Sequence, residues 1–83
     1  MRIQIHPEVL KQLQRLPRAE FEKALQTIIG LSDDPRPSGA KKLVVSANDW
    51  RVRFGQYRIV YTIDDAEREA IVFIVAKRSD VYR

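Results

Sequence analysis

The feature that most constrains this sequence is a strand–turn–strand pattern between Trp50 and Ile63. Apolar and polar residues alternate through WRVRF and again through YRIVYTI, and the pair Gly55-Gln56 separates the two runs. A two-residue connection with glycine first is typical of a type II′ β-hairpin, whose twist matches that of its strands. The turn then determines the register of the hairpin. Three pairs are expected to face each other: Phe54 and Tyr57, Arg53 and Arg58, and Arg51 and Val60.

Strict alternation assigns each hairpin side chain to one of two faces. The apolar face is expected to pack on helices and contains Trp50, Val52, Phe54, Tyr57, Ile59, Tyr61 and Ile63. The opposite face, called the arginine face below, contains Arg51, Arg53, Arg58, Val60 and Thr62. Direct opposition of two arginines costs about a few tenths of a kcal/mol unless an anion or a carboxylate bridges them.

The arginine face has two interpretations. In the first it is a solvated sheet surface, although such surfaces usually mix lysine with glutamate. In the second it is a phosphate clamp, because guanidinium groups bind phosphate through planar, bidentate hydrogen bonds. The charge distribution is consistent with an anionic partner: residues 35–63 contain six basic residues and one acidic residue, whereas basic and acidic residues balance in residues 1–34.

The remaining periodicities predict one α+β domain over residues 1–83, with two N-terminal helices packed on an antiparallel β-sheet in the order β-α-α-β-β-β. Residues 2–6 alternate as an opening strand, and residues 7–16 have the apolar spacing of a helix. Pro17 is expected to restart a second helix that ends at Gly30. Its apolar stripe is predicted to contain Phe21, Ala24, Leu25, Ile28 and Ile29. Residues 42–45 form either a short strand or part of a long connection.

The predicted last strand, residues 70–76, is apolar on both faces. Alternation would place Ile71, Phe73 and Val75 on one face and Val72 and Ile74 on the other. A central strand that is covered on both sides has this composition. Because two helices can hardly cover both faces of the sheet, a partner protein laid across the second face is the alternative.

Composition removes several classes of function. The chain has no cysteine, which excludes disulfides and thiolate metal sites, and its one histidine, His6, is expected to be structural. No long apolar run or cleavable leader is present, so we expect a soluble, cytoplasmic protein with no membrane partner.

The C-terminal segment AKRSDVYR completes a recognisable combination. By pattern alone Tyr82 is a packing residue of the tail. Together with KL, WRVRFGQYRIVYTID and IVFIVAKRSDVY, however, the sequence resembles the RelE/ParE superfamily of bacterial toxins, most strongly over residues 42–82. The RelE-like resemblance implies the toxin of a type II toxin–antitoxin system, an mRNA interferase that cuts the message in the ribosomal A site. It implies a cognate antitoxin and the ribosome with mRNA as partners, and an endoribonuclease that needs no metal or cofactor.

Carried over position by position, the implied active surface consists of Arg51, Arg53, Arg58, Arg78 and Tyr82. Arginines would stabilise the charge that develops on the phosphate, and Tyr82 would stack on a base or assist proton transfer. The best-known pattern has lysines at the positions of Arg51 and Arg53. An arginine hardly loses its proton, so the general base is not identified by the sequence.

Two alternatives remain at this point. The ParE branch shares the fold but poisons DNA gyrase, and its members generally lack paired hairpin arginines together with a tail tyrosine, so WRVR with RSDVY favours the nuclease. A basic binding module without catalysis is the second alternative, because missing lysines are also expected in an inactivated copy.

Overall fold

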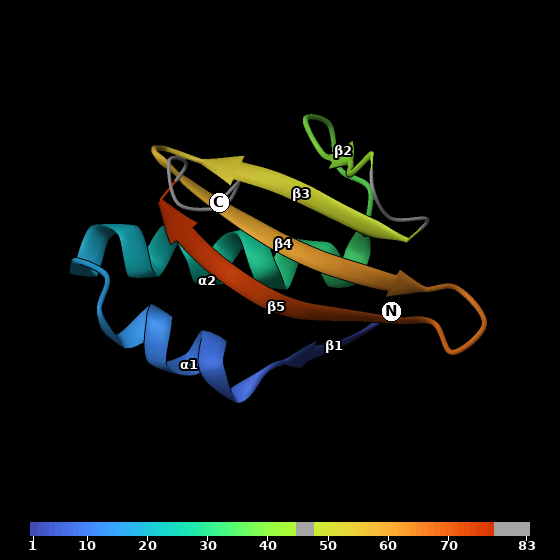
Figure 1. Ribbon diagram of the computed structural model, residues 1–83, viewed down its shortest axis with the longest axis horizontal. Coiled ribbons are helices and arrows are strands. Elements are labelled where there is room, and N and C mark those ends of the chain that lie inside the picture. The colour runs from blue at the N-terminus through green and yellow to red at the C-terminus, as the bar shows by residue number, and fades with distance from the viewer. Residues whose placement is uncertain (45–47, 78–83) are drawn as a thin grey trace.

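The computed structural model describes residues 1–44 and 48–77 of the chain. Within these ranges, five strands form one sheet in the order β1-β5-β4-β3-β2, and two helices lie on one side of it (Figure 1). The elements are β1 (Arg2–Ile5), α1 (Pro7–Gln14), α2 (Arg18–Asp33), β2 (Lys41–Lys42), β3 (Asp49–Phe54), β4 (Tyr57–Asp64) and β5 (Glu69–Lys77). The predicted α+β architecture with two N-terminal helices is confirmed.

The edges of the sheet differ from the simple meander that was expected. The first strand, β1, pairs with β5 in parallel, whereas the other three strand pairs are antiparallel. Residues 42–45 were expected to form either a short strand or part of a long connection. The structure has a short strand, β2, at Lys41–Lys42, and Leu43 and Val44 follow it outside any strand, whereas residue 45 lies outside the described residues. None of the helices in the described residues is long and apolar enough to cross a membrane.

The hairpin of β3 and β4 has the predicted register. Phe54 pairs with Tyr57, Arg53 with Arg58 and Arg51 with Val60. The turn glycine, Gly55, has a φ of 56°, a conformation that an L side chain rarely adopts, and Gln56 is not among the residues with positive φ. This combination is that of a type II′ turn.

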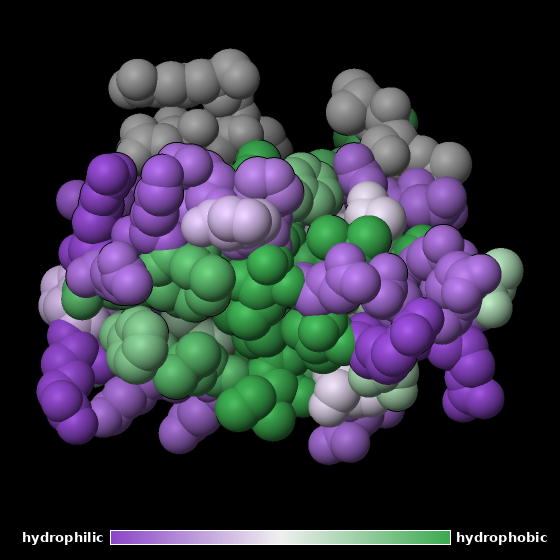
Figure 2. Space-filling view, turned by 90° about the horizontal axis from the view of Figure 1, so that it is seen from below, coloured by the Kyte–Doolittle hydropathy of each residue, from purple (hydrophilic) through white to green (hydrophobic). Residues whose placement is uncertain are grey.

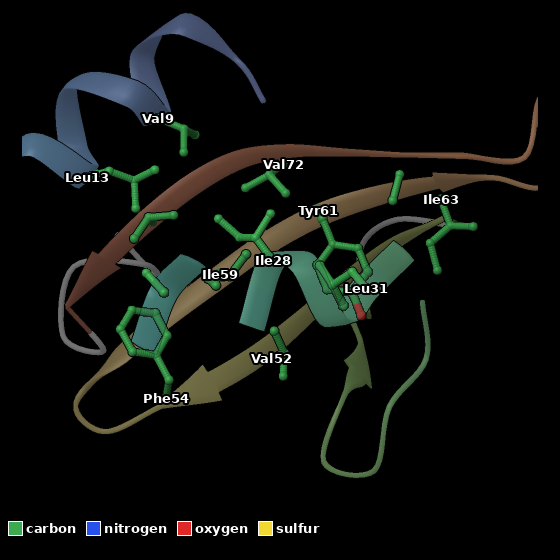
Figure 3. Close-up of a cluster of buried hydrophobic side chains, with 13 residues drawn as sticks. Val9, Leu13, Ile28, Leu31, Val52, Phe54, Ile59, Tyr61, Ile63 and Val72 are labelled. Atoms are coloured by element: carbon green, nitrogen blue, oxygen red, sulfur yellow. The ribbon is translucent and has the colours of Figure 1, made fainter. Parts of the chain in front are cut away.

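The apolar side of the hairpin forms the core together with both helices. Val9 and Leu13 of α1, and Ile28 and Leu31 of α2, pack against it (Figure 3). The side chains of Ile59 and Tyr61 are completely buried. Burial of such a side chain stabilises the folded state by about 1.5–3 kcal/mol.

The predicted course of α2 was wrong at its C-terminal end. The helix does not end at Gly30 but continues to Asp33. An interior glycine costs about 1 kcal/mol relative to alanine, and the complete burial of Leu31 in the following turn outweighs this cost. The apolar stripe therefore includes Leu31, whereas Ile29, which was expected to be part of it, is 65% exposed.

The first helix is also slightly shorter than predicted, ending at Gln14 instead of residue 16. His6 precedes it as the N-cap, and its Nδ1 accepts a hydrogen bond of 3.0 Å from the backbone N–H of Glu8. The structural role expected for His6 is thus confirmed. Seen from the side on which α1 and β1 lie, the surface is apolar at its centre and hydrophilic toward both ends (Figure 2).

A β-bulge in β5 overturns the predicted alternation of the last strand. Val60 pairs with Ile74 but its neighbour Tyr61 pairs with Val72, so Phe73 is an extra residue. The extra residue reverses the two faces beyond it. The core side of β5 therefore contains Ala70, Val72 and Val75, and the arginine face receives Ile71 and Ile74.

Beyond the bulge, β1 no longer pairs with β5, and a side chain of α1 accepts a hydrogen bond from the β5 backbone instead. The pairing with β1 ends at Ile5 and Val72. Farther along, the backbone N–H of Val75 donates a hydrogen bond of 2.8 Å to the side-chain oxygen of Gln12 in α1. Gln12 thus satisfies a polar group that β1 does not reach.

We predict that Gln12→Ala lowers the free energy of unfolding by about 1–3 kcal/mol, because it leaves the Val75 N–H without its acceptor. The matched control is Gln14→Ala, since Gln14 is exposed two residues farther along the same helix. Urea unfolding of both variants measures the difference. Equal stability of the two variants would contradict the importance of this contact.

A second set of contacts attaches the segment after α2 to the sheet. The hydroxyl of Tyr61 donates a hydrogen bond of 2.6 Å to the backbone carbonyl of Pro35. The next side chain, Arg36, lies 5.2 Å from the ring centroid of Trp50 and forms an ion pair of 3.0 Å with Asp65. Burial raises the pKa of Tyr61 to about 12, an effect that Arg36 reduces.

The raised pKa of Tyr61 makes stability depend on pH in the alkaline range. The folded state holds the phenol proton more tightly than the unfolded state, so this contribution is complete below pH 10 and is lost as pH rises toward 12. We predict that Tyr61→Phe is less stable than wild type at neutral pH, by about 1 kcal/mol, and that the difference narrows above pH 10. Denaturant unfolding at several pH values tests this.

Candidate nucleic-acid interface

The arginine face lies on the side of the sheet away from the core. Arg51 and Arg53 come from β3 and Arg58 from β4, and the observed register places all three on this face. Val60, between them on β4, is 2% exposed but is not a member of the core cluster. The three hairpin arginines predicted from the sequence are therefore brought together on one surface.

The three arginines differ in their access to solvent. Arg53 is exposed and Arg51 is half-buried. Arg58 is 4% exposed, and among the described residues it is the one charged side chain that is buried. A ligand can therefore approach Arg53 directly, whereas it reaches the guanidinium of Arg58 only after neighbouring atoms have moved.

A fourth cation, Lys41, joins this face through β2. Lys41 pairs with Arg51, and Lys42 pairs with Trp50, so the two adjacent lysines belong to opposite sides of the sheet. Both lysines are exposed. Sequence reasoning did not include Lys41 in the site, because a strand of two residues has no periodicity that could assign a face. The signal that was available is the strongly basic composition of residues 35–63.

Acidic residues on the same face lie at the end remote from the Gly55 turn. Asp49 pairs with Thr62, and the hydroxyl of Thr62 donates a hydrogen bond to the Asp49 carboxylate. Farther along, Glu69 pairs with Arg2 and lies 3.7 Å from its guanidinium. The basic half of the face thus extends from the turn to the pair formed by Lys41 and Arg51.

The other two residues of the predicted site, Arg78 and Tyr82, lie outside the described residues. Their position relative to the hairpin arginines stays a prediction.

Comparison with known proteins identifies the family. Residues 3–82 match the family described as the ParE toxin of the type II toxin–antitoxin system parDE. The chain is 31% identical to RelE1 of Methanocaldococcus jannaschii over 84 aligned positions, which cover 98% of this chain and 93% of that protein. The chain belongs to the RelE/ParE superfamily of toxins. It is a RelE-like toxin of a toxin–antitoxin system.

Solved structures of the superfamily have the same fold. RelE in the archaeal RelE–RelB complex of Pyrococcus horikoshii superimposes with a TM-score of 0.84 at 27% identity, covering 96% of this chain and 97% of that one. The isolated RelE toxin of E. coli has a TM-score of 0.80 at 24% identity, covering 98% of this chain and 89% of that one. The likeness to E. coli RelE is one of fold.

The unequal burial of the arginines predicts unequal effects on stability. We expect Arg53→Ala to change the free energy of unfolding by less than about 0.5 kcal/mol, because Arg53 is exposed. Arg58→Ala should lower it by about 1–3 kcal/mol, because it removes a buried side chain together with its interactions. Urea unfolding of the two variants measures both values. If Arg58→Ala unfolded at the same urea concentration as Arg53→Ala, the buried position of Arg58 would be incorrect.

Proposed function

We propose that this toxin is a ribosome-dependent mRNA interferase that cuts mRNA in the A site, without a metal ion or a cofactor. The observation that carries the proposal is the collection of cations on one sheet face that the helices leave uncovered, in a chain of the RelE/ParE superfamily. Arginine forks suit phosphate, and a face of this kind suits a single RNA strand.

The reaction that fits the face is transfer of the phosphate within the RNA strand. The ribose 2′-oxygen forms a bond to the adjacent phosphorus, and the bond from phosphorus to the 5′-oxygen of the next nucleotide breaks. A base removes the proton of the 2′-hydroxyl, and an acid protonates the leaving 5′-oxygen. The products are a cyclic 2′,3′-phosphate and a free 5′-hydroxyl.

The residues have different roles in this proposal. Arg51 and Arg53 bind and orient the phosphate, since arginine keeps its proton and cannot serve as the base. Arg58 stabilises the charge on the phosphate once the RNA has displaced the atoms around it. By resemblance, Arg78 is a further phosphate contact, and Tyr82 stacks on a base or transfers a proton.

A cognate antitoxin is the second proposed partner. RelE of Pyrococcus horikoshii was solved as a complex with RelB. For this chain we propose neutralisation by an antitoxin that covers the arginine face or displaces the tail bearing Tyr82. The apolar surface on the side of α1 and β1 (Figure 2) is an additional place where such a partner can bury area. A cytoplasmic location follows from this function.

DNA gyrase poisoning is the second candidate function, because the matching family description is that of ParE. The two functions have different products. A gyrase poison leaves mRNA intact and accumulates cleaved DNA with gyrase, whereas an interferase cuts mRNA and leaves gyrase unaffected. A binding module without catalysis does neither.

We predict that the purified toxin cuts mRNA on translating ribosomes and that Arg53→Ala slows single-turnover cleavage by roughly a hundredfold or more. Primer extension on the recovered message measures the rate. Arg15→Ala is the matched control, because Arg15 is an exposed arginine at the end of α1. The cleavage rate of Arg58→Ala is measured only at temperatures at which its unfolding curve shows that the variant is folded.

Two outcomes would reject the proposal at different levels. An intact message with wild-type toxin, combined with gyrase-linked DNA breaks, would assign the chain to the gyrase poisons. If Arg53→Ala and Arg58→Ala cut mRNA at the wild-type rate, the proposed nuclease activity would stand, but the arginine face would not be part of its active site.

A further inference from the structure

The pairing of β2 with β3 extends the basic surface beyond the hairpin. Lys41 lies directly opposite Arg51, and neither residue is buried. Side chains at directly opposed positions of an antiparallel pair have Cβ atoms about 4.5–5.5 Å apart. The ammonium group of Lys41 and the guanidinium of Arg51 can therefore contact the same anion or two adjacent ones.

Two opposed pairs of cations now lie side by side on the arginine face. The first pair is Lys41 and Arg51, and the second is Arg53 and Arg58. Arg51 and Arg53 are two residues apart on β3, which separates the pairs by about 7 Å. Four cations in two adjacent rows suit a chain of phosphates better than an isolated anion, with Arg58 reached only after the atoms around it have moved.

The acidic residues limit the direction of such a chain. Asp49 lies two residues before Arg51 on β3 and belongs to the same face. Its carboxylate accepts the hydrogen bond from Thr62. Repulsion by Asp49 disfavours a path along β3 away from the turn. A polyanion is therefore directed across the strands, from the hairpin arginines to Lys41 at the edge of the sheet.

We propose that Lys41 is an RNA-binding residue, which holds the phosphate next to the one bound by Arg51 and so positions the strand across β3 and β2. The identity of the ligand rests on the proposed function. Lysine binds phosphate as a flexible point charge, so Lys41 contributes to affinity and position but not to the chemical step. Its loss should raise KM for ribosome-bound message and leave kcat nearly unchanged.

The neighbouring lysine provides a matched control. Lys42 is the adjacent residue of the same strand, is also exposed, and pairs with Trp50, so it belongs to the side of the sheet that faces the helices. Lys41→Ala and Lys42→Ala remove the same charge and the same number of atoms, and they differ only in the face that loses the charge. Because both side chains are exposed, neither change should move the free energy of unfolding by more than about 0.5 kcal/mol.

The test is binding of a fluorescently labelled single-stranded oligouridylate, followed by anisotropy over a series of salt concentrations. Lys41→Ala should weaken binding several-fold and reduce the slope of log K against log salt by about 0.7, the loss of one phosphate contact with a single strand. Lys42→Ala should retain the wild-type affinity and slope. Lys41→Arg, which keeps the charge, should restore both.

Equal weakening by the two alanine variants would overturn the proposal, since it would show only a general effect of net charge. Failure of the wild-type toxin to bind oligouridylate would also overturn it. Binding with the expected dependence on Lys41, together with an uncut message on ribosomes, would support the assignment of Lys41 while rejecting the nuclease function.

Discussion

The turn at Gly55-Gln56 is the constraint on which the rest of the structure depends. It sets the register of β3 against β4, and a slip of one residue in one strand would turn the arginines of that strand toward the helices and its core side chains toward water. The register of this pair also determines which side chains of the neighbouring strands lie on each face, because β2 pairs with β3 and β5 pairs with β4. The hydrophobic core and the basic surface therefore have the same origin.

Much of the fold was predictable because its strongest signals are local. Alternation and a glycine turn were sufficient for the hairpin, its register and its two faces. The bulge at Phe73 was not predictable, since a strand that is apolar on both faces carries no pattern that an extra residue would break. The continuation of α2 through Gly30 depends on the burial of Leu31, which is a property of the tertiary structure and not of the local sequence.

For the candidate site, too, some features could be predicted from the sequence and others required the tertiary structure. The grouping of Arg51, Arg53 and Arg58 follows from alternation, and the structure confirms it. The burial of Arg58 does not follow from alternation, because it depends on the position of β4 inside the sheet and on the groups around it. Lys41 reaches the face only through a two-residue strand, so tertiary pairing was needed to find it.

The arginines also determine where the chemistry of the proposed reaction must come from. A fold alone does not select a reaction, which depends on the residues of the site. Arginine keeps its proton in proteins, so Arg51, Arg53 and Arg58 are not candidates for the general base of the proposed reaction. In the proposed reaction such a face would hold the phosphate without accepting the proton of the 2′-hydroxyl. Any pH dependence of cleavage would therefore report a group outside these three arginines, either elsewhere in the toxin or in the ribosome.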